Sequence, residues 1–452
     1  MKALSGPPVV GHLLDFRSRR LELLRRVAEE CGDLGLIRLG PLRAVVVSSA
    51  RLSREVLTER HHEFSRVPLQ GMDGLKALFG DGMLVADGDK HAAQRKRVMS
   101  AFSRKRIQAN AAVVASEADA WQASLIDGQE LDLFAETDRL TRRIARRTLF
   151  GMSGSAELDE GLEQALTQSA VFAMAELMRL VPLPGWIPSP HNVGFRRIVR
   201  ALDERILTMV QRRRANPAEG DDALSVLVNE AERGLTDREL RDDLMSLFVA
   251  GNEASSAALF WCLHHLVLDA ELAERLGVEA NRALSGLVPG GGVEVERPLA
   301  TAIYRESLRL YPAAHVIIRR TASELELGGA RVPKDVMVMI NGYMIHRDAA
   351  VYERPDQFHP SRFLENARAL PTSHYFPFGA GPRTCIGNHF ATLQGPLALS
   401  VIHRALRFEP LSSAEVRLST GFAIVPAQPY RVRVRRVAAR RASSALPVGK
   451  PS

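Results

Sequence analysis

The sequence predicts one mainly α-helical domain with a minor β region, and three observations favour this class. Helical periodicity dominates from about residue 92 to residue 311. Short β-branched runs lie on both sides of that segment. The hydrophobic fraction of 46% over 452 residues is ordinary for a globular core. Because no internal repeat divides the chain, we expect one domain over residues 1–437, followed by a basic, disordered tail over residues 438–452.

The expected elements follow one another in a simple order. Residues 36–40 and 43–47 are predicted to form two strands, because β-branched and apolar residues stand on either side of Pro41. A long central helix is expected near residues 240–269, where apolar residues recur on several faces, as in a buried helix. Strands are expected again after Pro312, including residues 336–340.

The net charge of +8 lies in the C-terminal segment. Residues 431–452 carry seven arginines and lysines and no acids, so removing them leaves a charge of +1 for the rest of the chain. Aromatic residues for base stacking are missing there, which argues against a nucleic-acid partner. The three cysteines are too few and too widely spaced for a disulfide framework or a zinc finger. A reducing compartment is expected.

The N-terminus breaks at once into Gly6, Pro7 and Pro8. It has neither the apolar segment of a signal peptide nor an uninterrupted membrane span. We therefore expect no membrane anchor and a cytoplasmic location.

Residues 378–387 hold a thiol within a glycine-rich turn that leads into a predicted helix. Glycine lets the backbone approach a flat macrocycle without a Cβ in the way. The thiolate is the metal-binding form of cysteine, and its pKa falls near a cation and at a helix N-terminus. Arg383 and the helix after Cys385 would supply both influences. This pattern suits a thiolate bound to haem iron, and the alternative is a buried structural cysteine.

The same stretch resembles the ligand loop of the cytochromes P-450, which reads Phe-x-x-Gly-x-Arg-x-Cys-x-Gly. The resemblance implies the cytochrome P-450 fold, haem b as cofactor and Cys385 as the iron ligand, with Phe378, Arg383 and Gly387 against the haem. It also implies a monooxygenase that uses O2 and receives electrons from a ferredoxin or flavodoxin with its reductase. The chain has no room for an attached reductase.

Glu306 and Arg309 lie three residues apart in a predicted helix that ends at Pro312. Alone, such a pair is common on exposed helices and stabilises them little. The resemblance implies that the pair also binds Arg362, and that this triad holds the segment carrying Cys385.

His91 and Arg95 lie one helical turn apart on the same side of a basic segment. A solvated basic face is the ordinary interpretation. The resemblance instead implies that both bind the haem propionates, together with Arg383 and with Arg319, whose neighbour Arg320 is the alternative.

The predicted central helix contains a motif that the resemblance places beside dioxygen. Ala250, Gly251 and Glu253 match the family pattern of small residues followed by an acid. The chain departs from that pattern at Ala254, where the family has a threonine whose hydroxyl helps to deliver protons. Ser255 or Asn252 with water, a substrate hydroxyl, or a reaction less dependent on ordered protons could compensate. Poor coupling, with loss of electrons to hydrogen peroxide, is a fourth possibility.

The resemblance also implies an apolar substrate pocket. Its expected lining is Leu75, Leu78, Phe79, Phe172, Met174, Phe248, Val316, Ile317 and Phe422. An apolar pocket favours a terpenoid, steroid, fatty acid or polyketide, and hydroxylation or epoxidation as the reaction. Core packing is the alternative for each position. Arg179 and His315 are candidate anchors for a polar substrate group.

Two other functions compete with the monooxygenase. The first is a haem-thiolate enzyme that uses peroxide directly or catalyses a coupling or rearrangement. The second is a haem sensor or carrier without enzymatic activity.

Overall fold

A computed structural model of the chain describes residues 1–66, 73–151, 165, 168–169, 187, 189–216, 222–231, 234–251, 253–285, 296–365 and 370–437. The predicted pocket residues Phe172 and Met174, the candidate anchor Arg179 and the predicted tail over residues 438–452 lie outside these ranges.

The helices are α1 (Leu13–Ser18), α2 (Arg20–Cys31), α3 (Ala50–Arg54), α4 (Asp73–Phe79), α5 (Gly88–Ala101), α6 (Arg104–Ser124), α7 (Leu133–Phe150), α9 (Pro190–Ala215), α10 (Ala223–Ala231), α11 (Asp237–Ala250), α12 (Glu253–Leu268), α13 (Ala270–Ser285), α14 (Pro298–Leu310), α15 (Gly342–Ile345), α16 (Arg362–Glu365) and α17 (Asn388–Ala405). Short turns of other helix types are η1 (Glu55–Glu59), η2 (His61–Glu63) and η4 (Gly381–Arg383). The strands are β1 (Lys2–Ala3), β2 (Leu34–Leu39), β3 (Leu42–Val47), β4 (Phe64–Ser65), β5 (Glu130–Asp132), β6 (Ile317–Thr321), β7 (Leu325–Leu327), β8 (Ala330–Val332), β9 (Met337–Ile340), β10 (Leu406–Pro410), β11 (Leu418–Thr420), β12 (Ile424–Pro426) and β13 (Arg431–Arg436).

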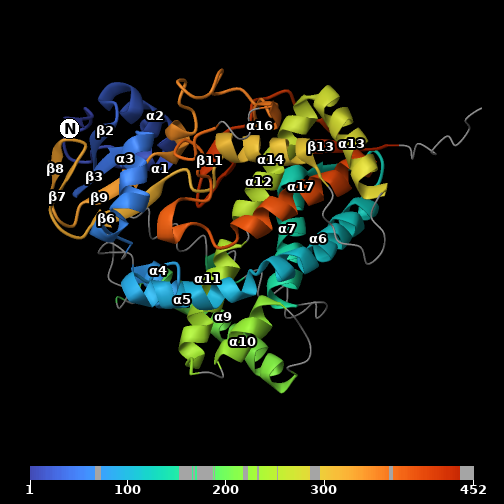
Figure 1. The fold of residues 1–452 in the computed structure, drawn as a ribbon, viewed down its shortest axis with the longest axis horizontal. Coiled ribbons are helices and arrows are strands. Elements are labelled where there is room, and N and C mark those ends of the chain that lie inside the picture. The colour runs from blue at the N-terminus through green and yellow to red at the C-terminus, as the bar shows by residue number, and fades with distance from the viewer. Residues whose placement is uncertain are drawn as a thin grey trace, which may run out of the picture.

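Helices predominate, as the sequence predicts, and the largest sheet lies at the side of the molecule that holds the N-terminus (Figure 1). This sheet has the strand order β1-β2-β3-β9-β6-β4. The predicted strands over residues 36–40 and 43–47 are confirmed as the antiparallel pair β2 and β3. Strand β9 confirms the predicted strand over residues 336–340 and joins β3 in parallel. The sheet therefore brings the start of the chain beside the segment that follows α14.

The helical side of the molecule packs around α12, which is buried along nearly its whole length. Helices α7, α14 and α17 contact it, and α6 packs against α17 (Figure 1). Trp261 of α12 stacks on Tyr311 with ring centroids 3.8 Å apart, and its indole N–H donates to the carbonyl of Ile424. A second core lies among α5, α9, α10 and α11.

The sequence predicts a long central helix near residues 240–269, and α11 and α12 occupy nearly all of this range. Helix α11 ends at Ala250 and α12 is described from Glu253, whereas the candidate Asn252 between them lies outside the described residues. Thr236 caps α11, because its hydroxyl accepts the Glu239 N–H while the Glu239 carboxylate accepts the Thr236 N–H. Gly251, a weak helix former, follows the end of α11. The predicted site motif therefore lies at a junction between two helices.

The basic C-terminal segment is partly a strand. Arg431, Arg433 and Arg435 belong to β13, which pairs with β10 and β5. Arg433 contacts Glu130 at 2.8 Å and Arg435 contacts Glu409 at 2.9 Å. Much of the charge assigned to a tail is thus compensated within a sheet. Among the described ranges, we find no helix whose length and apolar character would let it cross a bilayer.

Candidate active site

The loop over residues 378–387 holds Cys385 between η4 and the start of α17. The Cys385 N–H donates to the carbonyl of Phe378 at 2.8 Å, and the Thr384 hydroxyl donates to the carbonyl of Gly381 at 2.8 Å. Gly381 has a φ of 71°, and a Cβ there would collide with the carbonyl oxygen of Leu57. Glycine is therefore required at this turn, which fixes the loop against η1.

Cys385 combines an accessible side chain with the electrostatics of a buried one. Its side chain has accessible surface, yet burial is the largest influence on its pKa and raises it. Both observations hold if the accessible surface borders an internal cavity. The Gly387 N–H and the charge of Arg95 act in the opposite direction and lower the pKa. The cation that lowers this pKa in the structure is Arg95, while Arg383 pairs with Asp87. An iron ion would itself deprotonate a coordinating thiol.

Arg383 belongs to a cluster of cations. Its guanidinium donates to the Ala86 carbonyl at 2.8 Å and pairs with Asp87, the residue that caps α5. One of its nitrogens, Nη1, is buried without a hydrogen-bond partner among the described residues. Arg66 lies in the same cluster, where burial and the neighbouring Arg383 lower its pKa to about 10.

His91 and Arg319 complete the cluster. Burial, followed by repulsion from Arg383 and Arg95, lowers the pKa of His91 to about 4. Burial, followed by repulsion from Arg66 and Arg383, lowers the pKa of Arg319 to about 9. A desolvated cluster with this excess of positive charge fits the two carboxylates of a haem, because buried charges need partners of opposite sign. Arg66 and Asp87 were not identified from the sequence; Asp87 before Gly88 is a helix-cap signal, but nothing local links it to Arg383.

The structure brings Glu306, Arg309 and Arg362 together. Arg309 donates to both carboxylate oxygens of Glu306 at 2.8 Å, and Arg362 donates to Glu306 at 3.1 Å. Glu306 and Arg309 are fully buried. Arg309 also donates to the backbone carbonyls of His346, Pro355 and Gln357. The pair therefore ties α14 to residues 346–357, before the loop of Cys385, and is more than the exposed ion pair that its spacing alone suggests.

The motif of Ala250, Gly251 and Glu253 lies at the junction of α11 and α12. Ala250 ends α11, and the Ser255 hydroxyl donates to the carbonyl of Gly251 at 3.2 Å. The Glu253 carboxylate accepts the N–H of Ala423 at 3.1 Å. Burial is the largest influence on Glu253 and raises its pKa. Ala254 brings no hydroxyl, so Ser255 is the nearest alcohol along the chain and is already bonded to the backbone.

The predicted pocket residues divide into two groups. Leu78, Phe79 and Phe248 are buried in the second core, with 0%, 4% and 7% of their surface exposed, and Phe248 stacks on Phe150 with centroids 3.7 Å apart. Core packing, the alternative interpretation, describes these three. Val316, Ile317 and Phe422 keep accessible surface and can still line a pocket. Leu75 belongs to α4, but its side chain is outside the described structure.

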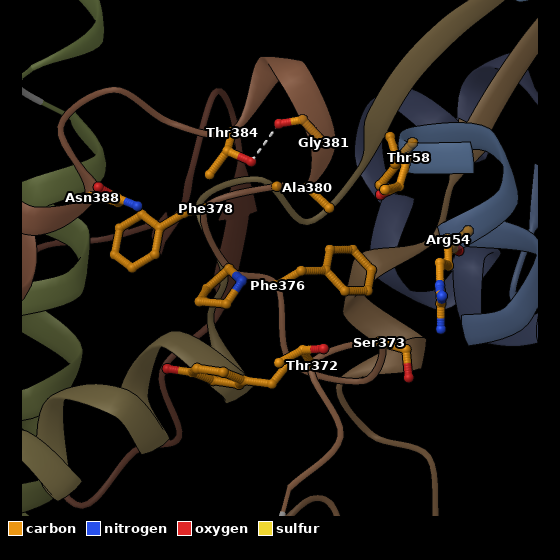
Figure 2. Close-up of a pocket in the computed structure, with 15 residues that line it drawn as sticks. Arg54, Thr58, Thr372, Ser373, Phe376, Phe378, Ala380, Gly381, Thr384 and Asn388 are labelled. Carbon is orange, nitrogen blue, oxygen red and sulfur yellow. Dashed lines mark hydrogen bonds between the residues drawn. The ribbon is translucent and has the colours of Figure 1, made fainter. Parts of the chain in front are cut away.

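A hollow of about 460 Å³ lies beside the cysteine loop (Figure 2). Arg54 and Thr58 come from α3 and η1 on one side, while Phe376, Ala380 and Thr384 come from the segment that includes the loop. The hollow is open and partly polar, and Cys385 does not line it. The sequence gives no signal for it, because its two sides are more than 300 residues apart.

Comparison with known proteins identifies the family. A family model described as Cytochrome P450 matches residues 4–434. The chain is 30% identical to pentalenene oxygenase of Streptomyces avermitilis over 91% of each chain. It is also 30% identical to two proteins of Streptomyces melanosporofaciens. Cyclooctatin synthase is similar over 92% of this chain and 91% of its own, and cyclooctat-9-en-7-ol 5-monooxygenase over 89% and 88%.

A mainly helical fold, an accessible thiol in a glycine-rich loop and a nearby cluster of arginines are features expected of a haem-thiolate protein. The chain belongs to the cytochrome P450 family. This family binds haem b through a cysteine thiolate. The protein is accordingly a monooxygenase that uses O2 and oxidises an apolar organic substrate.

Proposed function

We propose that the protein oxidises a terpenoid, with Cys385 as the ligand of the haem iron. The observation that supports the assignment of Cys385 is an accessible thiol at which burial nevertheless raises the pKa. The terpenoid class is supported by relatives whose names include pentalenene and cyclooctat-9-en-7-ol. The accessible apolar residues Val316, Ile317 and Phe422 are compatible with such a substrate.

The cofactor, when bound, supplies the iron centre that activates dioxygen for insertion of one oxygen atom into the substrate. Side chains of the protein would hold this cofactor and adjust its properties. Arg319 and Arg383, with His91 and Arg95, would bind the propionates, and Arg66 would add a further cation. Glu306, Arg309 and Arg362 keep the segment before the cysteine loop fixed. Gly387 donates its N–H to the Cys385 sulfur, which stabilises the thiolate.

Proton delivery falls to the junction of α11 and α12. Gly251 and Ala250 leave space there, and Glu253 is the acid nearest to it along the chain. Since Ala254 lacks a hydroxyl, water held by Ser255 or by backbone carbonyls replaces the alcohol. Loosely held water does not deliver protons to one fixed position. This chain should therefore lose a larger share of its electrons to hydrogen peroxide than an enzyme that has threonine at this position.

Electrons come from a separate ferredoxin or flavodoxin that docks over the hollow beside the cysteine loop. Thr384, which precedes Cys385, lines that hollow, so the docked partner lies a short way from the iron ligand. Arg54 at its edge is exposed and pairs with Glu59 at 2.9 Å; an acidic partner that displaced Glu59 would gain this charge, because complementary charges speed encounter.

The proposal is tested with the purified, haem-loaded protein. The dithionite-reduced protein with carbon monoxide should show the strongly red-shifted Soret band of a thiolate ligand. Pentalenene should then give an oxidised product with NADH, a ferredoxin and its reductase. A band typical of histidine ligation would contradict the assignment of Cys385, whereas a thiolate band with no pentalenene product would contradict the substrate assignment alone.

Replacing Ala254 with threonine should raise the fraction of NADH that yields oxidised product severalfold. The added hydroxyl would hold a water in a fixed position beside Glu253. The measurement compares product and hydrogen peroxide formed per NADH consumed. Ala254→Val is the matched control, because valine has the shape of threonine without the hydroxyl. Equal coupling in the two variants would show that shape, not the hydroxyl, matters.

Peroxide-driven oxidation is a second candidate, which the missing hydroxyl at Ala254 favours. It predicts product formation from hydrogen peroxide alone, at a rate at least equal to that with NADH and a ferredoxin. Product only with the electron donors would exclude it.

A further inference from the structure

The turn between β11 and β12 is held by side chains from distant parts of the chain. Thr420 and Ile424 form the last backbone pair of this hairpin, so Gly421, Phe422 and Ala423 make the turn. The Gly421 N–H donates to the carbonyl of Ala423 at 3.0 Å. The remaining polar groups of so short a turn must find partners in water or in other elements.

The first partner is Glu253, at the start of α12. Its Oε1 accepts the Ala423 N–H at 3.1 Å, and the Phe422 N–H also bonds to the carboxylate. A Cβ built on Gly421 would lie 3.1 Å from the same oxygen, so the turn is seated directly against the carboxylate. Eight residues further along α12, Trp261 donates to the carbonyl of Ile424 at 2.7 Å. Two side chains of α12 therefore hold consecutive parts of the hairpin.

The opposite side of the turn meets α2. Arg20 of α2 donates to the carbonyl of Gly421 at 3.4 Å and contacts Nε2 of His315 at 3.3 Å. Burial, followed by repulsion from Arg20, lowers the pKa of His315 to about 4, so His315 is neutral and its Nε2 can accept. The turn is thus fixed between α12 and α2. Phe422 at its apex keeps 38% of its surface exposed.

We propose that Glu253 is a positioning residue for this turn: its carboxylate fixes the backbone of Phe422 and Ala423, and thereby sets where the Phe422 ring meets the substrate. Glu253 and the hairpin that carries Phe422 then act as one structural unit. A change in the Glu253 side chain alters the site of oxidation as well as proton delivery. The effect on the site of oxidation rests on the proposed function, whereas the effect on the turn does not.

The first test measures hydrogen exchange of the haem-loaded protein by mass spectrometry, in peptides that cover residues 418–426. Glu253→Ala removes the acceptor, so exchange of the Phe422 and Ala423 amides should rise roughly ten- to a hundredfold, as for the loss of a hydrogen bond to a charged group. Glu253→Gln keeps a carbonyl oxygen at this position and should rescue most of the protection. Exchange in Glu253→Ala equal to that of the unmodified protein would overturn the proposal.

Two further variants separate a local effect from general loosening. Gly421→Ala leaves Glu253 intact but presses a Cβ against its oxygen, and should raise exchange in the same peptides. Glu279→Ala is the matched control, because Glu279 likewise accepts two backbone N–H groups, those of Leu299 and Ala300, at 2.7 and 2.9 Å. It should raise exchange at the start of α14 and leave residues 418–426 unchanged. A rise in residues 418–426 in the Glu279→Ala variant would show general loosening and overturn the proposal.

The second test uses pentalenene as the probe and compares product ratios. Glu253→Ala should shift the ratio of oxidation positions, while Glu253→Gln should lower turnover and keep the ratio. An equal shift in both variants would assign the effect to the lost charge and overturn the role of the hairpin in selectivity. If pentalenene is not oxidised by the unmodified protein, the substrate proposal fails, and the exchange result still decides whether Glu253 holds the turn.

Discussion

The Cys385→Ala variant is expected to lose the thiolate spectrum of its carbon monoxide complex and to fall to background monooxygenase activity. The thiolate donates electron density through the iron, and this donation promotes cleavage of the O–O bond. Alanine offers no ligand, and it leaves the Gly387 N–H without its sulfur acceptor. The measurements are the reduced difference spectrum with carbon monoxide and product formation from pentalenene with NADH and a ferredoxin.

The other cysteines provide the controls for this variant. Cys262 is buried in α12 and Cys31 ends α2, and neither is as exposed as Cys385. Cys31→Ala should keep both the red-shifted band and the turnover. A red-shifted band that survives in Cys385→Ala, or that disappears in Cys31→Ala, would show that another thiol is the ligand.

The cysteine loop could be predicted from the sequence because its determinants are local. Gly381 and Cys385 lie within one short segment, whose residues predict a glycine-rich turn around a thiol; the resemblance to the cytochromes P-450 implies that the turn faces a haem. The triad could be predicted only in part. The spacing of Glu306 and Arg309 shows that they share a helix face, but their burial depends on carbonyls of residues 346–357, which no local pattern reveals.

The remaining site residues depend on contacts between distant elements. Arg383 was expected beside the thiol, but it pairs with Asp87, nearly 300 residues earlier in the chain. Glu253 was expected to serve proton delivery or to make a local hydrogen bond, yet its carboxylate reaches Ala423, 170 residues later. The apolar character of Leu78 and Phe248 could not distinguish a pocket from a core, because both environments select the same residue types.

Mild acid is expected to destabilise the protein strongly, because several histidines are buried in the neutral form. His264, His315, His346 and His403 keep at most 8% of their surface exposed. Burial lowers the pKa of His264 and His315 to about 4, and that of His346 and His403 to about 3. The ordinary pKa of histidine is about 6.5, which applies in the unfolded chain.

The sign of the effect follows from these shifts. A lowered pKa in the folded state means that the stabilisation is fully present above pH 6.5 and is lost as the pH falls toward the folded pKa, since only the unfolded chain takes up protons. Between pH 8 and pH 5 each such histidine costs about 2 kcal/mol, and four cost about 8 kcal/mol. This is comparable to the whole free energy of unfolding of a typical domain, about 5–15 kcal/mol.

One buried acid acts in the opposite direction. Burial raises the pKa of Asp243 to about 6, although Arg97 lies 3.2 Å from its carboxylate. An acid whose pKa is raised in the folded state stabilises the fold as the pH falls, here by about 1 kcal/mol between pH 6.5 and pH 5. The histidines outweigh it, so the net loss remains about 7 kcal/mol and acid unfolding should begin near pH 5.

Urea unfolding at pH 8, 7, 6 and 5.5 measures this loss, and a histidine variant identifies its source. His403 is buried, and its Nδ1 has no hydrogen-bond partner in the described part of the chain. His403→Phe should therefore reduce the slope of the free energy of unfolding against pH, below pH 6, by about 1.4 kcal/mol per pH unit, the effect of one proton. His61→Phe is the control, because His61 is already exposed to solvent in the folded protein. If both variants show the same pH dependence as the unmodified protein, His403 does not contribute to acid unfolding. If the free energy of unfolding of the unmodified protein stays constant from pH 8 to 5.5, the role of all four histidines is contradicted.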